Sequence, residues 1–377
     1  MKSIYLDNAA TTALAPEVFE AMTPYLKEHY GNPSSTHHLG RKTKAVIETS
    51  RRTIAKALNC LPSEIYFTSG GTEADNLAMH AAVRDLGCQH IITSPIEHSA
   101  IIKTAELLRD QGKVQLHWVK LTATGHVDLE HLETLLSANA HAYVTLMHGN
   151  NEIANLLPLK KVSELCQKYE AIFHSDTVQT MGHYAFDLNQ VPISMLNAAA
   201  HKFHGPKGTG FIYINRHLKI QPDITGGGQE RGMRGGTENI AGIVGLAKAV
   251  ELAYSDLHHH AAHISQMKQL MKDGLLKLFP SIIFNGDSAS TESLYTVLNT
   301  TFPAHENADM FLFLLDLKGI CASGGSACSS GATKGSHVLG AINALRTGQA
   351  SVRFSFGRYT TQEEVEEALS IIQMLMQ

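Results

Sequence analysis

Short apolar segments typical of strands alternate with helix-like segments from residue 41 to residue 214. The segment 41–59 places apolar residues such as Ile47, Ile54 and Leu58 on one helical stripe. Further helical patterns cover 76–86 and 100–112, and the segments that read as strands are 64–67, 90–94, 114–119, 141–148, 171–176 and 210–214. Strands that alternate with helices predict βαβ units, and therefore a mainly parallel sheet covered by helices on both faces.

The pattern changes after the glycine-rich stretch "GGGQERGMRGGTEN" (226–239). A long helix is predicted around 240–275, and the later strand-like segments are 281–284, 293–302 and 352–356. This mixture predicts a smaller α+β domain in the C-terminal part of the chain.

Size and composition narrow the class of protein. A chain of 377 residues, 44% hydrophobic and 18% charged, is typical of a folded protein of two or three domains. The formal net charge of −4 gives no reason to expect a nucleic-acid partner or an anionic membrane. No apolar segment approaches the roughly 20 residues needed to cross a bilayer, and the first residues have no signal-peptide pattern.

The cysteines and histidines point away from disulfides and metals. The five cysteines have scattered spacings and no C-x-x-C pair, which favours a reducing, cytoplasmic compartment and a thiol role for any cysteine that matters. The 22 histidines include a triplet at 258–260, but no set has recognisable zinc spacing, so no metal is expected.

The stretch "FTSGGTEADN" (67–76) reads as strand, glycine turn and helix. The new helix offers unpaired N–H groups to an anion, and Thr72 adds a hydroxyl. A plain βα turn capped by Thr72 is the alternative. The stretch is neither a P-loop nor a G-x-G-x-x-G dinucleotide motif, which counts against a nicotinamide enzyme.

Two charged side chains follow apolar segments in the same half of the chain. Lys202 follows the apolar run 193–200 after one residue, His201, and Asp176 ends the predicted strand 171–176. Lys202 is either a solvated charge or an amine made nucleophilic by lost hydration at the mouth of a buried strand. Asp176 is either a helix cap or a buried carboxylate that needs a positive partner, such as a protonated pyridine nitrogen.

Lysine, acid and anion-binding helix together are typical of a pyridoxal 5'-phosphate site. The residue that selects the reaction is expected elsewhere. Cys328 lies in "SGGSACSSG" (323–331), a run of small and polar residues that predicts an exposed loop. A thiol in such a loop is a candidate nucleophile.

Ten ordered blocks carry a family resemblance along nearly the whole chain. They are 5–12, 31–40, 67–76, 97–100, 148–153, 174–179, 200–208, 226–239, 325–331 and 352–358. On these blocks the chain resembles the class I cysteine desulfurases of the NifS and IscS type, which belong to the fold type I (aminotransferase-like) pyridoxal phosphate enzymes. The resemblance implies a large domain (14–255) with a mainly parallel sheet of the seven-stranded type. It also implies a smaller α+β domain, formed by 1–13 and 256–377, that carries the cysteine loop.

The resemblance also implies residue roles. Lys202 is the Schiff-base lysine, His98 stacks on the cofactor ring, and Cys328 accepts sulfur from L-cysteine as a persulfide while L-alanine leaves. The remaining roles are Asp176 at the ring nitrogen, Gln179 and Asn151 near the phenolic oxygen, Gly71, Thr72 and His201 at the phosphate, Thr237 reaching in from the second subunit of a homodimer, and Asn32 and Arg353 at the substrate carboxylate. The sulfur acceptor, in iron–sulfur cluster assembly or in thio-cofactor or tRNA synthesis, is not specified.

Some positions depart from the family pattern. Ala199 stands where serine is frequent, so one phosphate hydroxyl is expected to be missing, while Ala154 and Thr177 replace glycine and alanine. The segment 332–339 also differs from the usual Leu-Glu-Pro sequence. Two rival readings stay open: a selenocysteine lyase with the same cofactor chemistry, and a catalytically silent binding or scaffold protein on this fold.

Overall fold

The computed structural model describes residues 3–325 and 335–377 of the chain. Its helices are α1 (Pro16–Lys27), α2 (His38–Ala57), α3 (Gly71–Arg84), α4 (Ser99–Asp110), α5 (Leu129–Ala138), α6 (Leu159–Lys168), α7 (Ile240–Ser255), α8 (Leu257–Leu278), α9 (Phe311–Leu317), α10 (His337–Ala341) and α11 (Gln362–Leu375). Short 3₁₀ helices cover Pro62–Glu64, Ala200–Lys202, Gln229–Gly232 and Ala308–Met310.

Seven strands of the described chain form one large sheet in the order β2-β8-β7-β6-β5-β3-β4. They are β2 (Ile65–Thr68), β3 (His90–Thr93), β4 (Gln115–Trp118), β5 (Tyr143–Thr145), β6 (Ile172–Asp176), β7 (Met195–Ala199) and β8 (Gly210–Ile214). β8 runs antiparallel to both of its neighbours, and the other pairs are parallel. The predicted α/β class with a mainly parallel seven-stranded sheet is confirmed.

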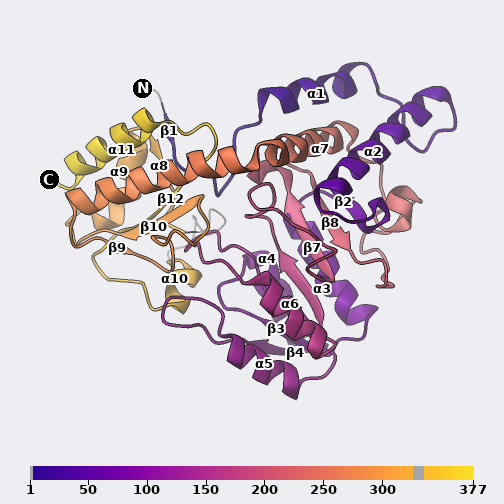
Figure 1. Cartoon of the computed structure of the whole chain (residues 1–377), viewed down its shortest axis with the longest axis horizontal. Helices are drawn as coiled ribbons and strands as arrows, with labels where there is room; N and C mark the ends of the chain where they lie inside the picture. The colour runs from indigo at the N-terminus through magenta and orange to yellow at the C-terminus, as the bar shows by residue number, and fades with distance from the viewer. Residues whose placement is uncertain (1–2, 326–334) are drawn as a thin grey trace.

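Helices cover both faces of this sheet, as Figure 1 shows. Adjacent residues of one strand point to opposite faces of the sheet and therefore pack into two different hydrophobic cores. Ile92 and Val144 pack with residues of α2, α5, α6 and α7, whereas Ile91 and Tyr143 pack with residues of α3 and α4. The result is a three-layer arrangement with the sheet buried in the middle.

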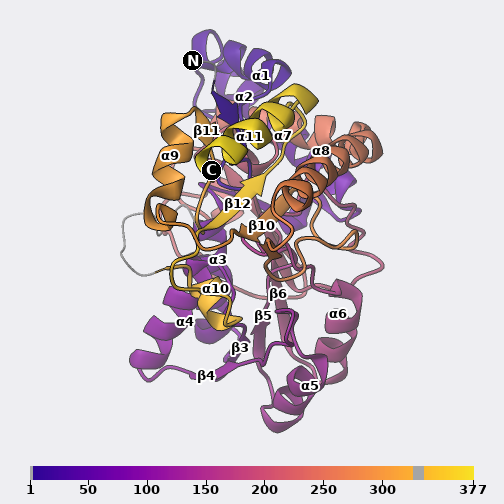
Figure 2. The same ribbon diagram turned by 90° about the vertical axis from the view of Figure 1, so that its left-hand side faces the viewer.

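A second group of elements lies at one side of the molecule, together with both chain termini (Figures 1 and 2). Its strands are β1 (Ile4–Tyr5), β9 (Ile283–Phe284), β10 (Val297–Thr301), β11 (Ile320–Cys321) and β12 (Ser351–Ser355). β10 lies between β12 and β9 in an antiparallel sheet, and β1 pairs with β11 in parallel. These strands and α8, α9 and α11 share a separate core, so the predicted α+β character is confirmed. The domain boundaries (14–255, and 1–13 with 256–377) stay a prediction.

The helix predicted around 240–275 is two helices. Asp256 has φ −137° and ψ 33°, which is outside the helical region, and it separates α7 from α8. Asp256 is a poor helix former, and its carboxylate lies 3.3 Å from His259 and 3.7 Å from His260 in the first turn of α8. The residues on both sides of Asp256 favour a helix, so the sequence pattern does not predict this break.

Candidate active site

A cavity of about 210 Å³ lies at the carboxyl ends of the parallel strands, the edge at which open α/β sheets bind ligands. Asp176 is the last residue of β6, and Lys202 follows β7 by three residues. Nine of the predicted site residues line the cavity: Gly71, Thr72, His98, Asn151, Asp176, Gln179, His201, Lys202 and Arg353. The fold therefore brings together residues that are far apart in the sequence.

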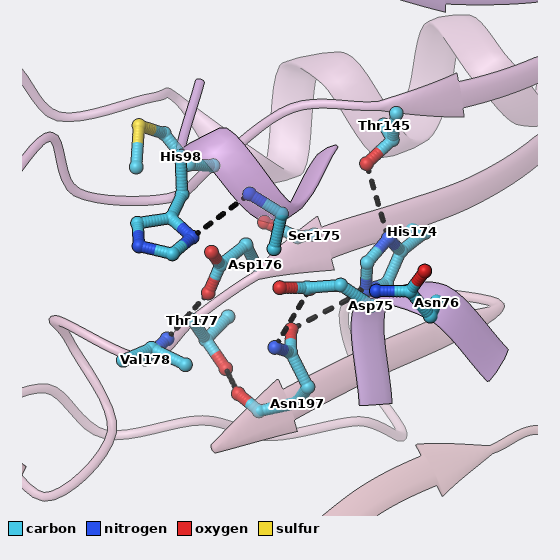
Figure 3. Close-up of polar contacts among 12 residues, drawn as sticks. Asp75, Asn76, His98, Thr145, His174, Ser175, Asp176, Thr177, Val178 and Asn197 are labelled. Atoms are coloured by element: carbon cyan, nitrogen blue, oxygen red, sulfur yellow. Dashed lines mark hydrogen bonds and ion pairs between the residues drawn. The ribbon is translucent and has the colours of Figure 1, made fainter. Parts of the chain in front are cut away.

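Asp176 is buried, and its carboxylate accepts a hydrogen bond of 2.9 Å from the Val178 N–H. Burial raises the pKa of Asp176, while His98, the Val178 N–H and Lys202 act in the opposite direction. Figure 3 shows His98 and Asp176 side by side. A buried carboxylate facing positive or protonatable groups fits a role as the partner of a cationic ring nitrogen.

Two further acids lie close to Asp176, and the sequence reasoning missed both. Asp75 lines the cavity, and burial raises its pKa well above the usual value, with repulsion from Asp176 and Glu97 adding to the effect. Glu97 is also buried, which raises its pKa to about 8. Both stand in blocks of the family resemblance, but their letters alone do not reveal burial. Burial therefore favours the protonated forms of Asp75 and Glu97, next to the acid on which His98 and Lys202 act in the opposite direction.

Buried hydrogen bonds connect Asp75 to Asn197, and Asn197 to His174 (Figure 3). The Asn197 amide donates to the Asp75 carboxylate at 2.9 Å, and its oxygen lies 3.3 Å from His174 Nε2. Burial lowers the pKa of His174 to about 4, so its ring is neutral. Nε2 then carries the proton, and Nδ1 accepts from the Tyr143 hydroxyl at 2.8 Å. Because each of these side chains is hydrogen-bonded to the next, the orientation of Asp75 is fixed.

Lys202 ends the 3₁₀ turn Ala200–Lys202 and is half-buried. Its Nζ donates to the carbonyl oxygens of Ala9 and Ala10 at 2.7 and 3.0 Å. Those carbonyls belong to the segment that follows β1, so the N-terminal residues help to build the cavity. The amine is held at the cavity surface by neutral acceptors, where it is placed for carbonyl chemistry.

His98 is the N-cap residue of α4. Its Nδ1 accepts from the Ala100 N–H at 3.2 Å, which leaves Nε2 to carry the proton of the neutral ring. Burial lowers the pKa of His98, and Asp176 partly offsets that effect. A neutral imidazole at the cavity wall can lie against an aromatic ring or take part in proton transfer.

The N-terminus of α3 opens onto the cavity through Gly71 and Thr72. A Cβ on Gly71 would lie 2.7 Å from Val178 Cγ2, so only glycine allows this close approach. His201 contributes from the opposite side, and burial lowers its pKa to about 4. Ala199 also lines the cavity and supplies no hydroxyl. Backbone N–H groups at a helix start are suited to bind a phosphate.

Arg353, a buried residue of β12, lines the cavity. Its Nη2 contacts Asp7 at 2.7 Å and its Nη1 donates to the Asn151 carbonyl at 3.0 Å. Its Nε has no hydrogen-bond partner within the described part of the chain. Gln179 donates to the Ala9 carbonyl at 2.9 Å. A buried guanidinium with an unused donor fits a carboxylate ligand.

Three predicted residues lie elsewhere. Asn32 is exposed outside the cavity, and its side-chain oxygen accepts from the Ser34 N–H at 2.9 Å. Thr237 is exposed and lines a second hollow with Gly208 and Glu238. Cys328 lies outside the described residues.

Comparisons with known proteins agree with this geometry. The aminotransferase class V family matches residues 4–368. A curated relative, cysteine desulfurase IscS of Dictyoglomus turgidum, is 39% identical over 100% of this chain and 95% of its own length. A solved NifS-like protein superposes with a TM-score of 0.91 at 35% identity, covering 99% of both chains. A structure of SspA in complex with cysteine gives a TM-score of 0.82 at 30% identity, covering 95% of this chain and 99% of SspA.

The chain belongs to the aminotransferase class V family and has the fold of the fold type I pyridoxal phosphate enzymes. Within that family it is a cysteine desulfurase of the IscS and NifS type. Among the described residues no helix is both long and apolar enough to cross a membrane.

Proposed function

We propose that the cavity binds pyridoxal 5'-phosphate through Lys202 and that Cys328 receives the sulfur of L-cysteine as a persulfide. The observation that supports this most is the meeting of Lys202, Asp176 and the α3 N-terminus in one cavity. An amine, a buried anion and a phosphate-binding helix end are the three groups that this cofactor requires. Ala199 supplies no hydroxyl to the phosphate, but this is compatible with cofactor binding because Gly71, Thr72 and His201 remain to hold the phosphate.

Asp176 would pair with the ring nitrogen, and His98 would lie against the ring. Gln179 and Asn151 would lie near the phenolic oxygen. Bound pyridoxal phosphate supplies an electron sink for the substrate α-carbon. Lys202, once its amine is free, moves the α-proton, with help from the neutral imidazole of His98.

Arg353 would orient L-cysteine by its carboxylate, whereas Asn32, predicted for the same role, lies outside the cavity. Arg353 lines the cavity, which places its guanidinium within reach of that carboxylate. Binding a charged substrate in a buried place restricts its orientation, so the sulfur faces one side of the cavity.

Sulfur transfer breaks one bond and makes another. The Cys328 thiolate attacks the substrate sulfur, a sulfur–sulfur bond forms, and the carbon–sulfur bond breaks with its electron pair going to carbon. That carbon takes a proton, and L-alanine leaves. The persulfide then passes to a sulfur-acceptor protein.

Replacing Cys328 by serine tests this assignment. The variant should form no alanine from L-cysteine while it still binds pyridoxal phosphate, because serine offers no thiolate. Cys321→Ser, a change seven residues upstream in β11, is the matched control and should keep activity. Alanine release at the wild-type rate by Cys328→Ser would contradict the role of Cys328. If Cys328→Ser loses alanine formation from L-cysteine but still forms alanine from selenocysteine, the thiol is needed for sulfur transfer alone.

A further inference from the structure

Glu152 is a fully buried acid for which the proposed mechanism has no use. It directly follows Asn151 of the cavity wall, and its backbone is fixed at both polar groups. Its N–H donates to the Asn150 side chain at 2.8 Å, and its carbonyl accepts from the Asn299 amide of β10 at 2.9 Å. The carboxylate therefore projects from a rigid position.

One oxygen of this carboxylate, Oε2, bonds to Ser336 and lies near Gly325, which stand after and before residues 326–334 in the sequence. It accepts a hydrogen bond from the Ser336 hydroxyl, which itself accepts from the Leu339 N–H at 3.1 Å and caps α10. On the other side, a Cβ placed on Gly325 would lie 3.2 Å from the same oxygen. Gly325 precedes the segment that contains Cys328, and Ser336 follows it.

The second oxygen of Glu152, Oε1, is buried without a hydrogen-bond partner within 3–325 and 335–377. Burying a charged group without full pairing costs free energy, which an apolar residue of similar size would avoid. Stability alone therefore does not account for an acid at this position. Glu152 also lies near His98 of the cavity wall, whose pKa it acts to raise.

We propose that Glu152 is a positioning residue for sulfur transfer: its carboxylate holds Ser336 next to the closely packed Gly325, the two residues between which Cys328 lies in the sequence. This proposal rests on the proposed function of Cys328. Glu152 acts through Ser336 and Gly325 and not on the substrate, so its removal should slow the step that needs Cys328 and spare the steps before it.

The test compares Glu152→Ala and Glu152→Gln with the wild type in single-turnover experiments. Two rates are measured after mixing with L-cysteine: the absorbance change of the bound cofactor, and persulfide formation on Cys328 by peptide mass spectrometry. Glu152→Ala should leave the absorbance change at the wild-type rate and slow persulfide formation by roughly 10²-fold, the cost of a misplaced reacting group. Glu152→Gln, which can still accept from Ser336, should be slowed by only about 10-fold.

Ser336 supplies a second pair of variants that does not depend on the folding of the Glu152 variants. Ser336→Thr keeps the hydroxyl and should behave as the wild type, whereas Ser336→Ala should resemble Glu152→Ala. The double variant should be no slower than Glu152→Ala, because both changes remove one interaction. In the cofactor-free protein, the alkylation rate of Cys328 by iodoacetamide should also change in Glu152→Ala.

Persulfide formation at the wild-type rate in Glu152→Ala would overturn the inference. So would a loss of cofactor binding that matches the loss of persulfide, because Glu152 would then support the cavity as a whole. A wild-type protein that forms no persulfide on Cys328 would instead refute the proposed function. The two failures are therefore distinguishable.

Discussion

Asp176 differs from the other buried acids of the cavity in its surroundings. His98 and Lys202 favour its ionised form, whereas Asp75 is subject mainly to burial and to repulsion from Asp176 and Glu97. Nearby positive or protonatable groups therefore oppose the effect of burial at Asp176 and not at Asp75, so Asp176 is the acid suited to pair with a cationic ring.

Asp176→Asn should separate catalysis from stability. Asparagine can still accept from the Val178 N–H but cannot pair with a positive ring nitrogen, so alanine formation should fall by at least about 10²-fold. The melting temperature of the cofactor-free variant should not fall, because a buried charge and its repulsion with Asp75 are removed. Normal alanine formation in this variant would contradict the role of Asp176.

At this scale, motif order located Lys202, Asp176 and the glycine turn, because each ends a segment with a clear apolar pattern. Asp75, Glu97 and Glu152 could not be found in the same way. Burial of an acid depends on the packing of distant segments, and no local pattern records it.

At the scale of elements, six of the seven strands of the large sheet were predicted because buried strands are short, nearly continuous apolar runs, whereas β7 was recognised only as part of the apolar run 193–200. The segment 171–176 corresponds to β6 within one residue, whereas 141–148 contains a β5 of only three residues, Tyr143–Thr145. The break between α7 and α8 was missed, because one aspartate between two helix-forming segments leaves the helical period almost intact.

α8 contains a buried lysine that makes stability depend on pH. Lys268 donates to the Ser293 hydroxyl at 2.7 Å and to the Leu294 carbonyl at 3.0 Å, and burial lowers its pKa from 10.5 to about 7. Between these two pH values the unfolded chain binds more protons than the folded chain at this site. The contribution of Lys268 to the free energy of unfolding therefore rises with pH from about 7 upward.

Lys268→Met should remove this dependence. The melting temperature of the wild type minus that of the variant should increase from pH 6 to pH 9, with the variant relatively more stable at the acidic end. Thermal unfolding of both proteins at several pH values measures the difference. A difference that stays constant with pH would show that Lys268 does not titrate in this range.

At the scale of the whole molecule, Thr237 lies in a hollow separate from the cavity of its own chain. A homodimer in which Thr237 reaches the phosphate of the partner subunit gives this residue its predicted role. In solution we expect a mass of twice the 41.0 kDa of one chain. A monomer by light scattering would contradict this expectation.

Mixing two variants tests whether Thr237 acts across the interface. Lys202→Ala is expected to be inactive, and Thr237→Ala should bind pyridoxal phosphate weakly. If Thr237 acts in trans, hybrid dimers formed at limiting cofactor should restore about a quarter of the wild-type sites, because one site in each hybrid has both residues. No gain on mixing, with subunit exchange confirmed, would place Thr237 in the site of its own chain or outside both.

The amine of Lys202 is the group on which the account as a whole depends, since every other assigned residue is placed relative to it. The most direct measurement is alanine and sulfide release by Lys202→Ala, together with its absorbance spectrum after pyridoxal phosphate is added and the excess removed. The account predicts no retained cofactor band and turnover reduced by several orders of magnitude. A variant that retains the band and releases alanine and sulfide at the wild-type rate would contradict it.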